Sequence, residues 1–329
     1  MSLPRRTILT AAGTLTLAAV APRILGAEGS AFAQDASKAV PTQQVVGAQR
    51  RKVGDAVVTA LSDGYINLGA DAVPNGSPEE LKPLFDSAFL DIENYRAAVN
   101  GYLVDFPDRR VLIDAGGEVA GFPTLGRLDE NLEAIGVEPG SIDALVVTHL
   151  HPDHVGGAIT ADGAKAFPNA QMIVRNEEVN FWRDDSKVNE GNKAFFQLAR
   201  NVLDAYGEAS TTIFDGDVEV VPGLTASFLP GHTPGHTGYM LDSGGEQMLI
   251  WGDIVHIPPV QFAQPKYYIG FDVNPDEAVE TRRKVMEMAE AERMKVAGMH
   301  HLFPGFGNVA KGAGEDEYRF VEAPFEYEL

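Results

Sequence analysis

Residues 148–154 read Thr148-His149-Leu150-His151-Pro152-Asp153-His154. They follow an apolar run, residues 144–147, that is typical of a buried strand, and α/β folds place their chemistry at the carboxyl ends of such strands. His149 and His151 are two residues apart and can point the same way from an extended backbone. The proline breaks regular structure, so that Asp153 and His154 can turn toward a neighbouring point. This stretch therefore offers four candidate metal ligands.

All eight histidines of the chain fall in this stretch and in three others. The other stretches are Gly231-His232-Thr233-Pro234-Gly235-His236, Gly252-Asp253-Ile254-Val255-His256 and Met299-His300-His301. Imidazole and carboxylate are the groups that zinc and its neighbours prefer. Together the stretches hold more ligands than one tetrahedral ion uses, so we predict two ions. Spacing alone does not choose between His300 and His301.

Composition limits the classes of function. The 329 residues carry a formal net charge of -21. A surface that acidic repels phosphate backbones and anionic lipid, so no nucleic-acid partner is expected. The chain has no cysteine, which excludes disulfides, thiolate metal ligands and a cysteine nucleophile.

Residues 1–33 have the pattern of a cleaved export signal. Arg5 and Arg6 precede a weakly polar run, and the small-x-small sequence at residues 31–33 is typical of a cleavage site. The paired arginines resemble a twin-arginine signal. The apolar run is shorter than the roughly 20 residues that span a bilayer, so no stable membrane anchor is expected. We therefore predict an exported protein, periplasmic or secreted.

The rest of the chain is expected to form a polar N-terminal arm, residues 34–54, and one folded domain, residues 55–329. Strand-like runs are predicted at 55–61, 97–105, 110–114, 144–148, 170–175, 218–221, 224–229, 237–241, 247–251 and 295–298. Helices are predicted at 125–135, 177–182, 192–206 and 275–293. Two sets of strands, each with helices, predict a layered α/β sandwich.

The stretches at residues 148–154, 231–236 and 252–253 resemble the signature of the metallo-β-lactamase superfamily, and the resemblance covers residues 55–329. It implies an αββα sandwich with a two-metal site at one edge, between the sheets. By that resemblance His149, His151 and His232 hold one ion, and Asp153, His154 and His300 hold the other, with Asp253 bridging both. It also implies supporting roles for Asp114 and His236, and His256 is expected to face the substrate. His300 is chosen over His301 because Phe303-Pro304-Gly305 follows in register with the nearest subfamily.

Within the superfamily, the chain most resembles methyl parathion hydrolase and its exported relatives. The matching strings are residues 123–128, 151–157, 260–262, 303–305 and 318–321. In such enzymes an aromatic pocket covers the metals. The candidates here are Phe122, Trp182 and Phe196, with Phe195 and Phe262 as further possibilities. A homodimer is expected by analogy alone.

The expected activity is hydrolysis of a phosphotriester, lactone or aryl ester bond in a small apolar substrate. A hydroxide shared by the two ions would attack the phosphorus or carbonyl centre. Zinc is the first choice of metal, although cobalt, manganese and iron share these ligands. Two alternatives stay open. One is an acyl-homoserine lactone lactonase, although residues 254–256 lack the tyrosine that such enzymes often carry; the other is a persulfide dioxygenase with a single iron.

Overall fold

The computed structural model describes residues 41–118 and 121–329. The predicted export signal and the first part of the predicted arm lie outside these residues. Residues 44–329 form one compact unit. None of the helices described combines the length and the apolar character needed to cross a membrane.

Two seven-stranded mixed sheets lie at the centre of this unit. The first sheet takes its strands in chain order: β1 (Ala48–Val53), β2 (Ala56–Leu68), β3 (Tyr95–Asp105), β4 (Arg110–Ile113), β5 (Ala144–Val146), β6 (Gln171–Arg175) and β7 (Thr211–Phe214). Strands β1 to β4 pair antiparallel, and β4 to β7 pair parallel. The parallel half brings the carboxyl ends of β4, β5 and β6 to one edge.

The second sheet runs in the reverse order, from β14 to β8. Its strands are β8 (Glu219–Val221), β9 (Leu224–Phe228), β10 (Thr237–Ser243), β11 (Glu246–Ile250), β12 (Lys295–Ala297), β13 (Phe306–Lys311) and β14 (Tyr318–Glu322). Only β11 and β12 pair parallel in this sheet. Alternate side chains of both sheets, such as Val104 and Val146 from the first and Leu241 and Ile250 from the second, pack into one buried cluster between them.

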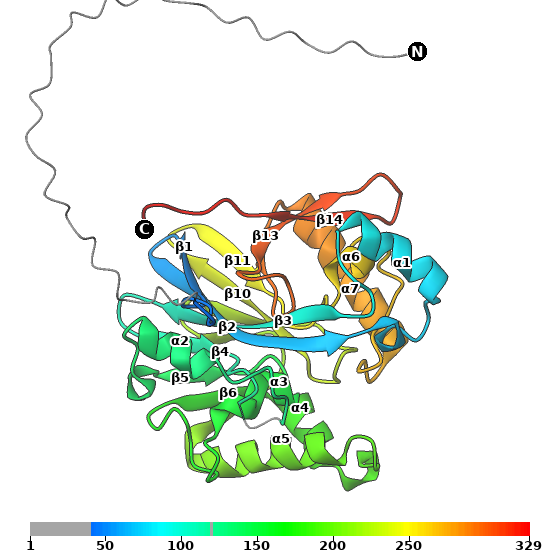
Figure 1. The fold of residues 1–329 in the computed structure, drawn as a ribbon. Coiled ribbons are helices and arrows are strands. Elements are labelled where there is room, and N and C mark those ends of the chain that lie inside the picture. The colour runs from blue at the N-terminus through cyan, green and yellow to red at the C-terminus, as the bar shows by residue number, and fades with distance from the viewer. Residues whose placement is uncertain (1–40, 119–120) are drawn as a thin grey trace, which may run out of the picture. The chain divides into compact units, whose positions relative to one another are not determined.

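Helices cover the outer faces of the two sheets. They are α1 (Pro78–Ser87), α2 (Leu128–Ala134), α3 (Pro152–Val155), α4 (Asn176–Arg183), α5 (Lys193–Tyr206), α6 (Pro258–Gln261) and α7 (Pro275–Ala291). Figure 1 shows α2 to α5 (green) on one side and α6 and α7 (yellow to orange) on the other. Buried residues of α2, α4 and α5 pack with the first sheet, and those of α7 pack with the second. The predicted αββα sandwich is confirmed.

Several elements differ from the sequence-based expectation. The last part of the predicted arm, residues 48–53, forms the edge strand β1. Charged side chains, which are common on edge strands, concealed the strand pattern in the sequence. Helix α1 was not predicted because Pro83 interrupts its pattern. Strands β7, β13 and β14 were also not predicted. Their residues are largely half-buried or exposed, so the sequence lacks an apolar alternation that would reveal them.

Candidate metal centre

The candidate ligands lie at the ends of four strands, in loops and in the short helix α3, which carries Asp153 and His154. The stretch at residues 148–154 follows β5, Asp253 follows β11 and His300 follows β12, whereas His232 precedes β10. These loops bring seven buried side chains into two clusters, and the ligand atoms of each cluster lie within 4.8 Å of one another.

The first cluster combines three imidazoles with one carboxylate: His149, His151, His232 and Asp253. Nε2 of His149 lies 3.0 Å from Nδ1 of His151, which lies 2.9 Å from Nε2 of His232. Oδ2 of Asp253 is 3.6 Å from His149 Nε2 and 3.2 Å from His232 Nε2. Four ligand atoms therefore converge as they do in a tetrahedral zinc site.

The second cluster contains Asp153, His154 and His300. Oδ2 of Asp153 is 3.5 Å from Nε2 of each histidine. Asp253 also reaches this cluster, because its Oδ1 lies 3.3 Å from His154 Nε2 and its Oδ2 lies 3.1 Å from His300 Nε2. Asp253 is thus the side chain that the two clusters share.

Hydrogen bonds on the far side of the rings fix which nitrogen faces the first cluster. His232 donates from Nδ1 to Asp272 over 2.8 Å. Thr148 Oγ1 donates to Asp114 over 2.6 Å, so it can only accept from Nδ1 of His149, 3.0 Å away. Both rings therefore direct an Nε2 lone pair at the cluster.

The second cluster has the same arrangement. His154 Nδ1 donates to Asp114 over 2.7 Å, and His300 Nδ1 donates to the carbonyl oxygen of Ala98 over 2.8 Å. Their Nε2 atoms then face the carboxylates of Asp153 and Asp253, which is a repulsive arrangement unless a cation or a proton lies between them. His154 Nε2 and Asp253 Oδ1 are buried without a hydrogen-bond partner. The donor set therefore fits two divalent cations.

The charges of the cluster shift its pKa values when no cation is bound. Burial lowers the pKa of His154, but Asp253, Asp153 and Asp114 outweigh it and raise that pKa well above its usual value. Burial also opposes protonation of His232, yet its carboxylate partners raise its pKa to about 9. Protons thus occupy the ring nitrogens that a metal ion would use.

The sequence pattern of the metallo-beta-lactamase superfamily matches residues 95–300, which include every residue of both clusters. The chain belongs to the metallo-β-lactamase superfamily. The two clusters have the composition expected of a metal-dependent hydrolase of this superfamily.

The chain is also similar to solved structures and to curated proteins. The crystal structure of AbOPH, described as a hydrolase in the beta lactamase superfamily, is 30% identical with a TM-score of 0.81 and covers 86% of this chain and 100% of its own. AidC, a dizinc quorum-quenching lactonase, has a TM-score of 0.80 at 24% identity, over 85% of this chain and 98% of its own. This similarity is one of fold. An N-acyl homoserine lactonase of Bacillus thuringiensis is 25% identical over 51% of this chain. The match spans only 59% of that lactonase.

In this superfamily member, Asp114 supports the ligand loop from the end of β4. It is one of three non-glycine residues described with a positive φ, 57°, a conformation that aspartate tolerates better than most residues. Its carboxylate accepts from the backbone N–H of Thr148 over 2.8 Å, besides the bonds to Thr148 Oγ1 and His154. Asp114 therefore holds both ends of the 148–154 stretch.

The predicted supporting residue His236 lies beneath the shared carboxylate. Its Nδ1 donates to the carbonyl oxygen of Leu229 over 2.7 Å, and its Nε2 accepts from the backbone N–H of Asp253 over 2.8 Å. His236 belongs to neither cluster. It positions the backbone that carries Asp253.

Two supporting carboxylates were not predicted from the sequence: Asp272 and Glu178. Asp272 orients His232, and Glu178 on α4 ties two ligand loops together. One oxygen of Glu178 accepts from the N–H of Leu150 and from the indole of Trp182, and the other accepts from Thr233 and from the N–H of Gly235. Neither residue lies in a histidine-containing stretch, so no spacing pattern pointed to them.

A cavity of about 230 Å³ opens directly above the clusters. Its wall is apolar except for the ligands and His256, and consists of Ile66, Leu68, Ala97, Phe122, Phe195 and Phe271. His256 stacks on His300 with ring centroids 4.9 Å apart, and its Nε2 lies 3.0 Å from Asp253 Oδ2. His256 thus lies on the cavity wall and forms a third possible ligand group with Asp253 and His300.

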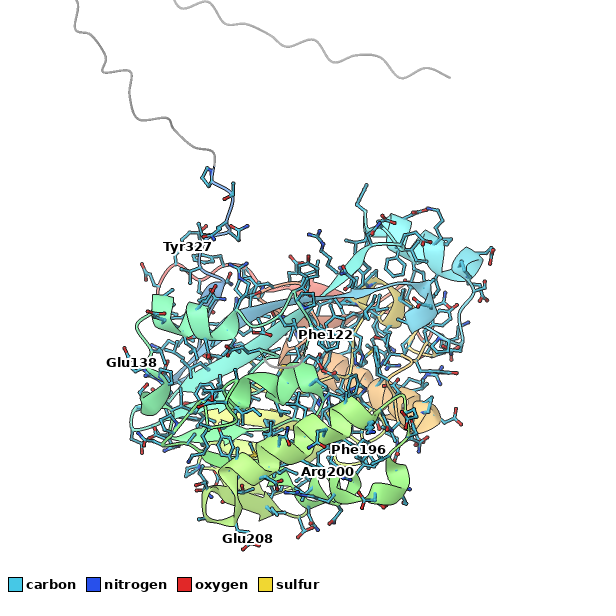
Figure 2. The ribbon with its side chains drawn as sticks, turned by 60° about the horizontal axis from the view of Figure 1, so that its bottom comes forward. Phe122, Glu138, Phe196, Arg200, Glu208 and Tyr327 are labelled. Atoms are coloured by element: carbon cyan, nitrogen blue, oxygen red, sulfur yellow. The ribbon has the colours of Figure 1, made fainter. Side chains whose placement is uncertain are left out.

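Two of the predicted pocket aromatics lie elsewhere. Trp182 and Phe196 are buried in the core cluster between the helices and the first sheet and do not line the cavity. Trp182 packs behind His151, with ring centroids 5.5 Å apart. Figure 2 labels Phe196 on α5 beside Arg200, and Phe122 on a separate loop. Helical periodicity explains the difference, because it turns Phe195 toward the cavity and Phe196 into the core.

His301 also lies apart from both clusters. Its ring packs among Trp251, Phe262 and Phe320, with centroid distances of 5.3, 5.5 and 4.3 Å. The structure therefore brings His300 to the ligands and places the adjacent histidine, together with Phe262, around a different cavity.

Proposed function

We propose that this protein is a dinuclear metal-dependent hydrolase of small, uncharged esters with an apolar body. The observation that carries the proposal is Asp253, whose carboxylate joins two metal-ligand clusters at the floor of an apolar cavity. Bound there, two divalent cations would activate a water molecule and polarise the scissile ester oxygen. Zinc is the first choice, because histidine nitrogen and aspartate oxygen form the whole donor set.

The chain's own residues would select and position the substrate. Of the described residues, no lysine or arginine lines the cavity, so an anionic group away from the metal ions would find no basic side chain. Phe122, Phe195 and Phe271 would hold an alkyl or aryl body by apolar contact. His256 is the remaining polar group of the wall, and it would orient the ester beside Asp253.

Two kinds of ester suit this cavity. The resemblance to methyl parathion hydrolase supports aryl phosphotriesters and aryl esters. The similarity to the N-acyl homoserine lactonases of Bacillus thuringiensis and of Azorhizobium caulinodans supports lactones with an apolar acyl chain. Both kinds carry an electrophilic centre that an activated water can attack.

The test is a substrate panel with the zinc-loaded mature protein. We expect turnover of at least one of paraoxon, N-hexanoyl homoserine lactone and 4-nitrophenyl butyrate, and its loss when Asp253 is replaced by Asn. The matched control is Asp242→Asn, because Asp242 is an exposed carboxylate on β10. Absence of turnover across the panel, or an active protein that holds a single iron ion per chain, would refute the proposal and favour a mono-iron dioxygenase.

We also predict that the protein is exported, to the periplasm or out of the cell, and that it forms a homodimer. The sequence motif at Arg5 and Arg6 supports twin-arginine export. Replacing both residues by lysine should leave the precursor inside the cell, as fractionation and immunoblotting would show. Processing that continues unchanged would contradict this route.

A further inference from the structure

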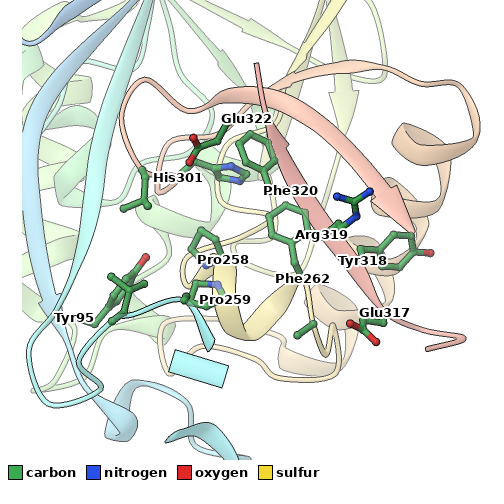
Figure 3. Close-up of a pocket in the computed structure, with 14 residues that line it drawn as sticks. Tyr95, Pro258, Pro259, Phe262, His301, Glu317, Tyr318, Arg319, Phe320 and Glu322 are labelled. Carbon is green, nitrogen blue, oxygen red and sulfur yellow. The ribbon is translucent and has the colours of Figure 1, made fainter. Parts of the chain in front are cut away.

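A second cavity lies on the other side of the loop that carries His300. It has a volume of about 350 Å³ and is lined by residues from β3, α6 and β14 and from the loops after α1 and after β12. Figure 3 shows the main contributors around it, with Tyr95 at one end and His301 and Phe320 at the other. It shares no lining residue with the cavity above the metal ligands.

The wall of this second cavity is apolar and contains buried polar groups that have no partner. Leu90, Pro258, Phe262 and Phe320 supply apolar surface. The Tyr95 hydroxyl and both ring nitrogens of His301 are buried without a hydrogen-bond partner. Tyr95 is 2% exposed and His301 is 1% exposed. A buried polar group without a partner is destabilising, so a molecule that bonds to such a group recovers that cost.

The surrounding structure fixes the buried position of His301. Its ring packs at a steep angle against Phe320, with ring centroids 4.3 Å apart, and a Cβ atom at Gly298 would come within 2.2 Å of its ring carbon Cδ2. Any residue other than glycine at position 298 would therefore displace the imidazole. A neutral imidazole both donates and accepts hydrogen bonds, and here it has neither partner.

We propose that this cavity is a second ligand site, which binds a small, uncharged, mainly apolar molecule carrying one hydroxyl or carbonyl oxygen. The apolar walls contact the body of the ligand, and the Tyr95 hydroxyl bonds to its oxygen after a small movement of the ring. Mostly apolar walls with a few convergent polar groups, in a volume above about 300 Å³, are typical of small-molecule sites. The charged lining residues are the exposed Arg319 and Glu322 and the half-buried Glu317, so none of them places a charge in the buried interior.

The site touches two of the loops that serve the metal centre. Pro258 and Phe262 follow His256 in the chain, and His301 follows His300 directly. The proposal concerns binding in this cavity, and it holds whether or not the metal centre hydrolyses esters.

The test uses 4-bromophenol and bromobenzene as probes with the zinc-loaded protein. In a crystal soaked with 4-bromophenol, the anomalous signal of bromine should lie between Tyr95 and His301. By calorimetry, 4-bromophenol should bind more tightly than bromobenzene by about threefold to tenfold, the worth of one hydrogen bond. Bromine located only above the metal ligands, or equal affinity for the two probes, would overturn the proposal.

Two variants test the lining directly. Tyr95→Phe should remove most of the preference for 4-bromophenol and leave bromobenzene affinity within about twofold. Because it deletes a hydroxyl that has no partner, it should fold and melt like the parent protein. Ala263→Leu should weaken both probes by filling the cavity, and Ala161→Leu, at an exposed site far from this lining, should change neither. Unchanged binding in both cavity variants would overturn the proposal.

Discussion

Asp253 holds the two clusters together at the level of a single side chain. Its two oxygens lie within 3.3 Å of ring nitrogens from His154, His232 and His300. Burial raises its pKa, but the surrounding histidines, His154 foremost, outweigh it and lower that pKa well below its usual value. It therefore stays ionised and can bridge two cations.

Asp253→Asn should lower turnover by several orders of magnitude, because an amide offers only one neutral oxygen in place of two charged ones. We expect fewer than two metal ions per chain by elemental analysis. Circular dichroism should show the fold retained. Full metal content together with full activity would rule out a bridging role.

Asp272 acts on the metal through His232. Its Oδ1 accepts the Nδ1 proton of that ring, and its Oδ2 accepts from the N–H of Ile269. Asp272→Asn should therefore weaken metal binding by about 10–100-fold, the usual effect of losing such a partner. Chelator competition would measure it, and Asp276→Asn on the exposed start of α7 is the control. Equal affinities in the two variants would show that Asp272 does not orient the ligand.

The raised pKa values of His154 and His232 predict how metal binding depends on pH. Without metal, both rings are protonated at pH 7, since the pKa of His232 is about 9 and that of His154 is also raised. Metal must displace these protons, so affinity should rise with pH up to about 9, by about tenfold per pH unit for each proton displaced. Competition titrations from pH 6 to pH 9 would measure the slope. An affinity that does not change over this range would contradict the assigned protonation.

At the level of elements, loops that follow short buried strands carry the ligands, and helix α4 holds two of these loops in place. Glu178 lies in the first turn of α4 and accepts four hydrogen bonds, from residues 150, 182, 233 and 235. Burial raises the pKa of this carboxyl. The ionised form is therefore destabilised, and joining the two loops comes at that cost in free energy. Asp63 on β2 does the same for the loop that carries Phe122, because it accepts from the N–H groups of Gly117, Gly126 and Leu128.

Glu178→Gln should destabilise the protein by about 1–3 kcal/mol, because the amide group turns a donor toward other donors. Metal affinity should fall as well, since the loops of His151 and His232 lose their common anchor. Denaturant unfolding would measure the first effect. The neighbouring Glu177→Gln, at a half-exposed carboxyl, should show neither effect, and similar behaviour of the two variants would contradict the anchoring role.

At the level of the whole molecule, the metal site joins the two sheets. Its ligands come from the first sheet at residues 149–154 and from the second at residues 232, 253 and 300. Ions bound between them therefore link the halves of the sandwich. Binding to the folded state alone stabilises it by mass action.

Removal of the metal with a chelator should lower the melting temperature by about 5–10 °C. Adding zinc back should restore it, as differential scanning fluorimetry would show. The Asp253→Asn variant should respond much less to the chelator. An equal response in both proteins would show that the stabilising ions bind elsewhere.

The sequence predicted the sandwich and identified the candidate ligands, because both predictions depend on local sequence patterns. Buried strands such as β5 and β11 are short apolar runs, and a histidine-rich stretch is visible without any partner. Strand β14 and helix α1 were not predicted, since half-exposed residues and an internal proline conceal their periodicity. At the site, Phe195 and Phe196 are equivalent by composition, and only the turn of α5 distinguishes them.

The amino-acid sequence by itself determined the family, the layered fold and the chemistry of the donor atoms, since each follows from residue types at short spacing. Tertiary structure alone decided which groups meet across long separations. It brought Asp272 to His232 and Glu178 to two loops, and it directed His300 and His301 into different cavities. Hydrogen bonds and burial depend on positions in space, and the residues of these contacts, 28 to 57 apart in the chain, acquire those positions only when the chain has folded.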